Sequence, residues 1–197
     1  MFTILRAGAM CGFPLAAVAW AVEVLAVDSE VGGRLVVEAV SVEAAQPGVG
    51  KMKSRAFIDA LADERVVDAV RAAEARTSGE IRVFITRRKL GGEDVRARGQ
   101  TEFERLHVGN TALRNGVLFF VVPAEQTFAV IGDVGIHAKC GQSFWDETAA
   151  VMETLFREGK FTEGVLAGVQ RAGEVLARHY PRQADDRNEL SDRVARD

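Results

Sequence analysis

The chain has 197 residues, of which 48% are hydrophobic and 27% charged, a composition that is typical of a globular protein and excludes overall disorder. The formal net charge of −3 gives no electrostatic reason to expect a nucleic acid as partner. Only Cys11 and Cys140 are present, which excludes a disulfide framework and a CxxC metal site, and fits the reducing cytoplasm.

The first 51 residues lack the pattern of a folded domain. Residues 8–22 are apolar and follow a basic residue, so residues 4–26 resemble an export signal or a membrane anchor. However, Glu23 interrupts the apolar run before it reaches the roughly 20 residues that a membrane span needs.

The alternative is a mis-assigned start, since Met52 opens the first segment with a coherent pattern. A third interpretation is a genuine extra element of the protein. On the first two interpretations we expect residues 1–51 to be an extension outside the folded domain. Membrane contact is expected only if residues 1–26 belong to the natural protein, and cytoplasmic localisation otherwise.

The pattern from Met52 onward predicts an α/β domain over residues 52–181. A helix is expected from Asp59, as its cap, to about Arg76, because apolar residues recur on one helical face. Alternating apolar residues predict a strand at 81–86, and a weaker periodicity predicts a helix at 94–107.

The run Val117–Val122 is the strongest strand signal, because its continuous apolarity is typical of a strand buried on both faces. A short turn and a further strand at 127–131 should place these two strands antiparallel. Two helices follow. The first carries its buried face from Phe144 to Phe156, and the second is capped by Thr162 and ends at Pro181.

The predicted order is therefore α-β-α-β-β-α-α, a three-layer α/β/α sandwich around a mixed sheet. Residues 182–197 are charged and poor in apolar residues, so they are expected to form a flexible tail.

Seven short sequence motifs, in this order along residues 57–192, resemble the TPM domain family. They are Thr77-Ser78-Gly79-Glu80-Ile81-Arg82-Val83, Arg114-Asn115-Gly116-Val117-Leu118, Ile131-Gly132-Asp133-x-Gly135-Ile136-His137, Phe144-Trp145, Phe156-Arg157-Glu158-Gly159-x-Phe161-x-Glu163-Gly164, Gly173-Glu174-Val175-Leu176-Ala177-x-His179-Tyr180-Pro181 and Asn188-Glu189-Leu190-Ser191-Asp192. The resemblance is greatest to short bacterial members without a C-terminal membrane tail.

The resemblance implies a fold more strongly than an activity. Some plant members are acid phosphatases, others act in photosystem maintenance or as receptor accessory proteins, and binding of divalent cations recurs. No activity is common to all members.

Polar residues should gather at one end of the predicted sheet. If strands 81–86 and 117–122 are parallel, Glu80 and Asn115 precede them at the same end, and Asp133 arrives there after the antiparallel strand. Their oxygen donors suit Ca²⁺ or Mg²⁺, and no organic cofactor is indicated. Further candidate site residues at this end are Ser78, Gly132, Gly135 and His137.

Structural interpretations compete with this site. Asp133, between glycines, is also a suitable cap for the next helix, and His137 is also an ordinary loop residue. Arg82 and Arg114 are cationic groups near this end, but the sequence contains no phosphate-binding loop and no catalytic signature of a known hydrolase. A nucleophilic role for Cys140 would require a nearby base, for which His137 is the close candidate in sequence.

Two functions from different classes therefore remain open. The first is a binding or assembly module for a protein partner, with a stabilising divalent cation. The second is a weak, metal-assisted hydrolase of the acid phosphatase type that uses Glu80, Asn115 and Asp133.

Overall fold

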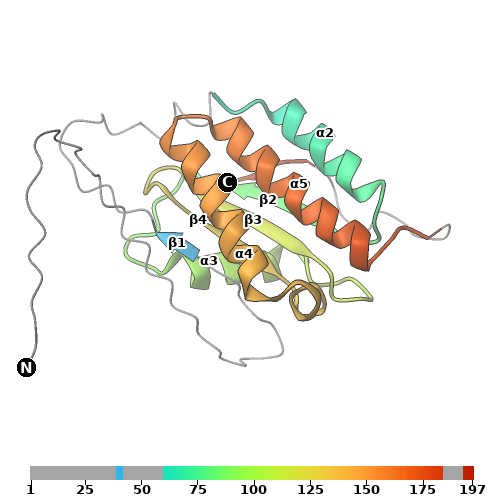
Figure 1. Cartoon of the computed structure of the whole chain (residues 1–197). Helices are drawn as coiled ribbons and strands as arrows, with labels where there is room; N and C mark the ends of the chain where they lie inside the picture. The colour runs from blue at the N-terminus through green and yellow to red at the C-terminus, as the bar shows by residue number, and fades with distance from the viewer. Residues whose placement is uncertain (1–38, 42–59, 184–192) are drawn as a thin grey trace, which may run out of the picture.

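The computed structural model describes residues 39–41, 60–183 and 193–197. Five strands form one mixed sheet in the order β1-β4-β3-β2-β5. They are β1 (Ala39–Ser41), β2 (Ile81–Ile85), β3 (Val117–Val122), β4 (Thr127–Gly132) and β5 (Ala195–Arg196). The helices are α2 (Asp63–Glu74), α3 (Val95–Arg105), α4 (Val134–Arg157) and α5 (Phe161–His179). Between residues 60 and 179 the element order is the predicted one (Figure 1).

The strand β3 lies at the centre of the sheet. It pairs in parallel with β2 and antiparallel with β4, and Val117 is opposite both Ile81 and Gly132. All six of its residues are buried. A strand whose side chains are apolar on both faces is stable only between two layers, so β3 requires helices on each side of the sheet.

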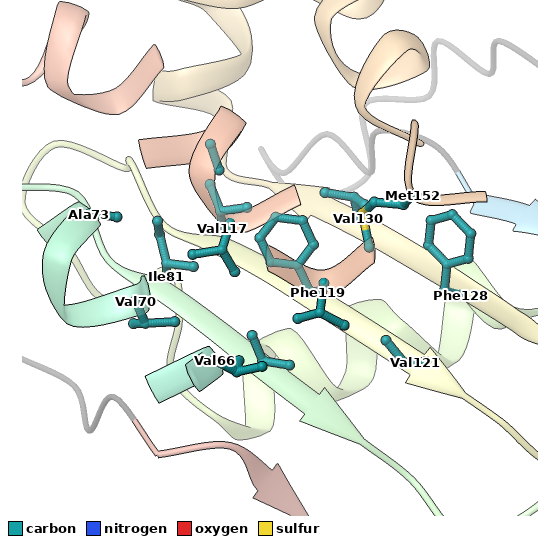
Figure 2. Close-up of a cluster of buried hydrophobic side chains, with 14 of the residues drawn as sticks. Val66, Val70, Ala73, Ile81, Val117, Phe119, Val121, Phe128, Val130 and Met152 are labelled. Atoms are coloured by element: carbon teal, nitrogen blue, oxygen red, sulfur yellow. The ribbon is translucent and has the colours of Figure 1, made fainter. Parts of the chain in front are cut away.

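The two faces of the sheet are covered by different numbers of the described helices. Figure 1 shows α2, α4 and α5 across one face, and α5 contacts both other helices. The second face packs mainly on α3. On the three-helix face, Phe119 lies within a core cluster that includes Val83, Val130 and Met152 (Figure 2). On the opposite face, Phe120 stacks on Phe84 with ring centroids 5.8 Å apart. The three-layer α/β/α prediction is confirmed.

One of the two predicted helix caps is wrong, and the other falls on a residue that the structure does not describe. Asp59 lies outside the described residues, and α2 has Ala62 at its N-cap position. Thr162 is the second residue of α5, which begins at Phe161. The Thr162 hydroxyl instead accepts a hydrogen bond from the Ala62 amide at 3.0 Å and donates to the Ala60 carbonyl at 3.2 Å. It therefore joins the start of α5 to the segment before α2.

Helix α4 is longer than the apolar pattern indicated, because it begins at Val134 instead of near Phe144. Gly141 interrupts it with φ 70° and ψ 176°, which separates a short first part from the amphipathic remainder. This left-handed φ is one that glycine adopts without steric cost. The break explains why helical periodicity is visible only after this residue.

Both outer strands come from segments that were expected to lie outside the folded domain. Residues 39–41, within the predicted extension 1–51, pair antiparallel with β4, and residues 195–196 of the predicted flexible tail pair in parallel with β2. The expectation was wrong at these residues because an edge strand has unpaired backbone groups, which even a short segment can satisfy. The rest of the extension up to residue 59, and residues 184–192 of the tail, lie outside the described residues.

Within residues 39–41, 60–183 and 193–197, no helix has both the length and the apolar character that crossing a membrane requires.

Candidate functional site

The predicted polar residues do lie at one end of the sheet, where β2 and β3 begin and β4 ends. The Val117 amide donates to the Glu80 carbonyl at 2.8 Å, and the Asp133 amide donates to the Gly116 carbonyl at 2.9 Å. These backbone bonds join the ends of three adjacent strands, so Glu80, Asn115 and Asp133, which flank these strands, lie at the same end of the sheet. We call this region, with Ser78, Gly132, Gly135 and His137, the polar end.

Asp133 has two structural tasks at the polar end. It is fully buried, and its two carboxylate oxygens accept from Arg114 Nε at 3.0 and 2.9 Å. It is also the N-cap of α4, accepting from the Val134 amide at 2.8 Å. A carboxylate at a helix N-terminus is favoured by the helix dipole, and the guanidinium neutralises its charge. The capping interpretation of Asp133 is thus confirmed.

The loop before β3 lies very close to the start of α4. A side chain at Gly135 would place its Cβ 2.3 Å from the Leu113 carbonyl and 2.5 Å from that of Arg114. Gly132 has a different reason to be glycine, because a Cβ there would lie 2.5 Å from the Trp145 ring. The two glycines therefore permit the packing of α4 against the polar end, which is a structural role.

Asn115 is the least satisfied side chain at the polar end. It is fully buried, and among the described residues neither its amide nitrogen nor its amide oxygen has a hydrogen-bond partner. Its backbone amide, in contrast, donates to Thr111 Oγ1 at 3.1 Å. A buried amide without partners costs about 1–3 kcal/mol, so a native structure that keeps one needs a reason for it.

Glu80 is also buried, with 4% of its surface exposed. Its carboxylate and the Asn115 amide bring further buried oxygen atoms to the polar end. Ser78 is half-buried, and its amide donates to the Tyr180 carbonyl at 3.0 Å, which ties the end of α5 to this part of the sheet.

His137 lies in the first turn of α4, where its amide donates to the Asp133 carbonyl at 3.0 Å. Burial lowers the pKa of its imidazole, and in the described part of the chain Nδ1 has no hydrogen-bond partner. The side chain is therefore neutral at pH 7 and contributes no positive charge.

Cys140 is half-buried on α4, and burial raises the pKa of its thiol to about 11. Since the thiolate is the nucleophile, this thiol is unreactive at neutral pH. Burial, together with the charges of Cys140 and Asp133, also raises the pKa of Tyr180. Sequence reasoning missed Tyr180 as a neighbour of this region, because its proximity depends on how the end of α5 packs.

Sequence reasoning named Arg114 as a nearby cation but did not pair it with Asp133. The signal was available, because Arg114 precedes the start of β3 and Asp133 follows the end of β4, and these two strand ends lie side by side at the end of the hairpin opposite its turn. Arg82 alternates with Ile81 and Val83 and therefore lies on the α3 face with Phe84. Within the described ranges, no group of three His, Cys, Asp or Glu side chains could hold a metal ion.

This fold and its buried polar end define a small α/β domain of the mixed-sheet sandwich class. The family model for the TPM domain matches residues 52–175. A solved structure that is similar to this chain is the NMR structure of the BA42 protein from the psychrophilic bacterium Bizionia argentinensis. It is 37% identical, with a TM-score of 0.63, and the match covers 70% of this chain and 96% of that one.

The chain belongs to the TPM domain family. Comparison with curated proteins finds no match. The resemblance inferred from the seven motifs is thereby confirmed, and with it the fold.

The double role of Asp133 predicts a large loss of stability in Asp133→Ala. We expect the free energy of unfolding to fall by about 2–4 kcal/mol, because the change removes a helix cap and half of a buried ion pair, whose other half, Arg114, is 40% exposed. Asp133→Asn keeps an acceptor for the Val134 amide and should lose about half as much. Urea denaturation of the full chain measures both.

The matched control is Asp94→Ala. Asp94 caps α3 by accepting from Arg96 and Ala97, but it does so at an exposed position, so its loss should cost about 1 kcal/mol. If the two alanine variants lose the same free energy of unfolding, the ion pair between Asp133 and Arg114 adds nothing to stability.

The raised pKa of Cys140 predicts slow alkylation at neutral pH. At pH 7.5 about one thiol in 3,000 should be ionised, and the rate with iodoacetamide should rise about tenfold per pH unit toward pH 11. The measurement uses a Cys11→Ser chain, with the same chain in urea as control, where the rate should level off near pH 8.5. A plateau near pH 7 in the folded chain would instead reveal an activated nucleophile.

Proposed function

We propose that this TPM domain is a binding module, with a divalent cation held at the polar end, and that its partner is a protein. The proposal rests on the burial, pairing and protonation of Asp133, Cys140 and His137, the side chains that could act as catalytic groups. Asp133 is fully buried and engaged by Arg114 and α4, Cys140 has a thiol pKa of about 11, and His137 is neutral. None of them is an activated nucleophile or a free cation for developing charge.

Asn115 supports the ligand-binding part of the proposal. Its buried amide oxygen is a neutral donor at the same end of the sheet as the buried carboxylate of Glu80, and hard oxygen donors of this kind fit Ca²⁺ or Mg²⁺. Asp133, whose carboxylate Arg114 and the Val134 amide already engage, would be the third residue of this set. A bound cation would also supply the partner that the Asn115 amide oxygen lacks among the described residues.

Asn115→Leu separates a ligand-binding role from a packing role. We expect the variant to lose Ca²⁺ and Mg²⁺ binding, which in the unaltered full chain should be tighter than about 1 mM by isothermal titration. In the absence of metal, its free energy of unfolding should rise by about 1 kcal/mol, because an apolar side chain of similar shape removes the cost of an unpaired buried amide.

The matched control is Asn110→Leu, at an exposed position of the same loop, where neither binding nor stability should change by more than about 0.5 kcal/mol. Metal binding that survives in Asn115→Leu would contradict the site. A stability loss above 1 kcal/mol without metal would show that the amide serves the fold.

The second candidate function is metal-assisted phosphate hydrolysis at the same residues. It is favoured by the burial of Glu80 and Asn115 at the same end of the sheet, because a carboxylate and an amide oxygen are donors that a catalytic Mg²⁺ uses. Hydrolysis would additionally need a group that activates water, and His137 is the neutral base nearest in the chain to Asp133.

Assay of the full chain with p-nitrophenyl phosphate distinguishes the two functions. The binding proposal predicts no Mg²⁺-dependent release above the uncatalysed rate, and the same background for Glu80→Gln and His137→Ala. Release that requires Mg²⁺ and falls at least tenfold in Glu80→Gln would establish the hydrolase instead.

A further inference from the structure

The outer edge of β2 is occupied by the last residues of the chain. Phe84 is opposite Ala195 and Ile85 is opposite Arg196, in parallel orientation. Without β5, β2 would be the edge of the sheet on this side. Adding an extended segment to an exposed edge is a general mode of peptide recognition, in which backbone bonds give affinity and side chains give specificity.

The side chains of this segment are recognised on both faces of the sheet. Val194 packs against the core cluster on the three-helix face, and Ala195 packs against the cluster on the α3 face. This alternation is what a strand presents to the two layers of a sandwich. The edge therefore accepts two small apolar residues in a fixed register.

The two following residues are recognised by charge. Arg196 pairs with Asp63 in the first turn of α2. Asp197 accepts from the Arg87 amide at 3.1 Å, and its carboxylate lies 3.4 Å from Arg88 Nε. The edge thus presents an acidic group to residue 196 and a basic group to residue 197, so it favours a segment with a basic residue followed by an acidic one. A segment with the reverse order would place like charges next to each other.

These anchors are too weak to make the segment a permanent strand. Only two residues pair with β2. The side chains that receive the charges are accessible to solvent, with 44% exposure for Asp63 and 76% for Arg88, whereas Arg196 and Asp197 are 23% and 19% exposed. Ion pairs that solvent reaches on one side contribute about 1 kcal/mol or less each. The segment is held chiefly because it is covalently tethered, which gives it a high effective concentration at the edge.

We propose that the outer edge of β2 is a strand-addition site for the segment Val194–Asp197, occupied by the chain's own segment and open to the same segment of a second copy. The second copy is the occupant favoured by the contacts, because each copy carries the sequence that this edge matches. Exchange between copies re-forms the same contacts, which makes it a low-cost route to association. The site is independent of the cation at the polar end.

The test uses the full chain with Arg196→Glu and Asp197→Arg, which repel Asp63 and Arg88 and release the tethered segment. A fluorescein-labelled peptide of residues 188–197 should bind this variant with a dissociation constant of about 0.1–1 mM, measured by fluorescence polarisation. The unaltered chain should bind it at least about fivefold more weakly, because its own segment competes at an effective concentration in the millimolar range.

The control peptide carries Arg196→Glu and should bind neither chain. Three results would overturn the proposal. They are equal peptide binding to the two chains, binding that does not depend on Arg196 of the peptide, and no binding at a concentration of about 2 mM. A second measurement needs no peptide: Asp197→Ala should speed hydrogen exchange of the Arg87 amide at least about tenfold, and an unchanged rate would show that the edge is not occupied.

Discussion

Burial of β3 on both faces is the constraint from which the rest of the structure follows. Six consecutive apolar residues leave no face for solvent, so one helical layer must cover each side. A strand in this position must also be hydrogen-bonded along both edges, which fixes β2 and β4 as neighbours. Because one neighbour is parallel and the other antiparallel, the starts of β2 and β3 meet the end of β4. The polar end is therefore a consequence of the topology.

The low dielectric and close packing at the polar end determine which of its buried side chains need a partner. Asp133 can be buried there because Arg114 and the α4 amides stabilise its charge, and this occupies it with structural interactions. Asn115 is buried at the same end without such partners in the described structure. The contrast between a satisfied carboxylate and an unsatisfied amide, on adjacent strands, gives the strongest reason to expect a ligand near Asn115 and a structural role for Asp133.

Sequence reasoning predicted the features that depend on local pattern. The strands at Val117–Val122 and Thr127–Gly132 follow from apolar runs and a turn, and the gathering of Glu80, Asn115 and Asp133 follows from strand direction. Sequence reasoning failed for side chains whose hydrogen-bond partners are distant in sequence. Thr162 bonds residues about 100 positions away, and no local pattern distinguishes this from a helix cap. The edge strands carry even less local signal, because two or three residues have no measurable period, and open edges of the sheet determine where they pair.

The two sites differ in the physical origin of their selectivity. At the polar end the proposed ligand would meet buried donors, so a ligand of the wrong size or charge would leave an unpaired group in low dielectric. At the β2 edge, the backbone provides most of the contacts and the charged groups are solvent-accessible, so recognition is weaker and sensitive to salt. The two proposals together would give the domain a rigid end that a ligand stabilises and an edge at which strands exchange. Assembly through such an edge would require no change in the core, because the residues that contact the added segment lie at strand and helix ends.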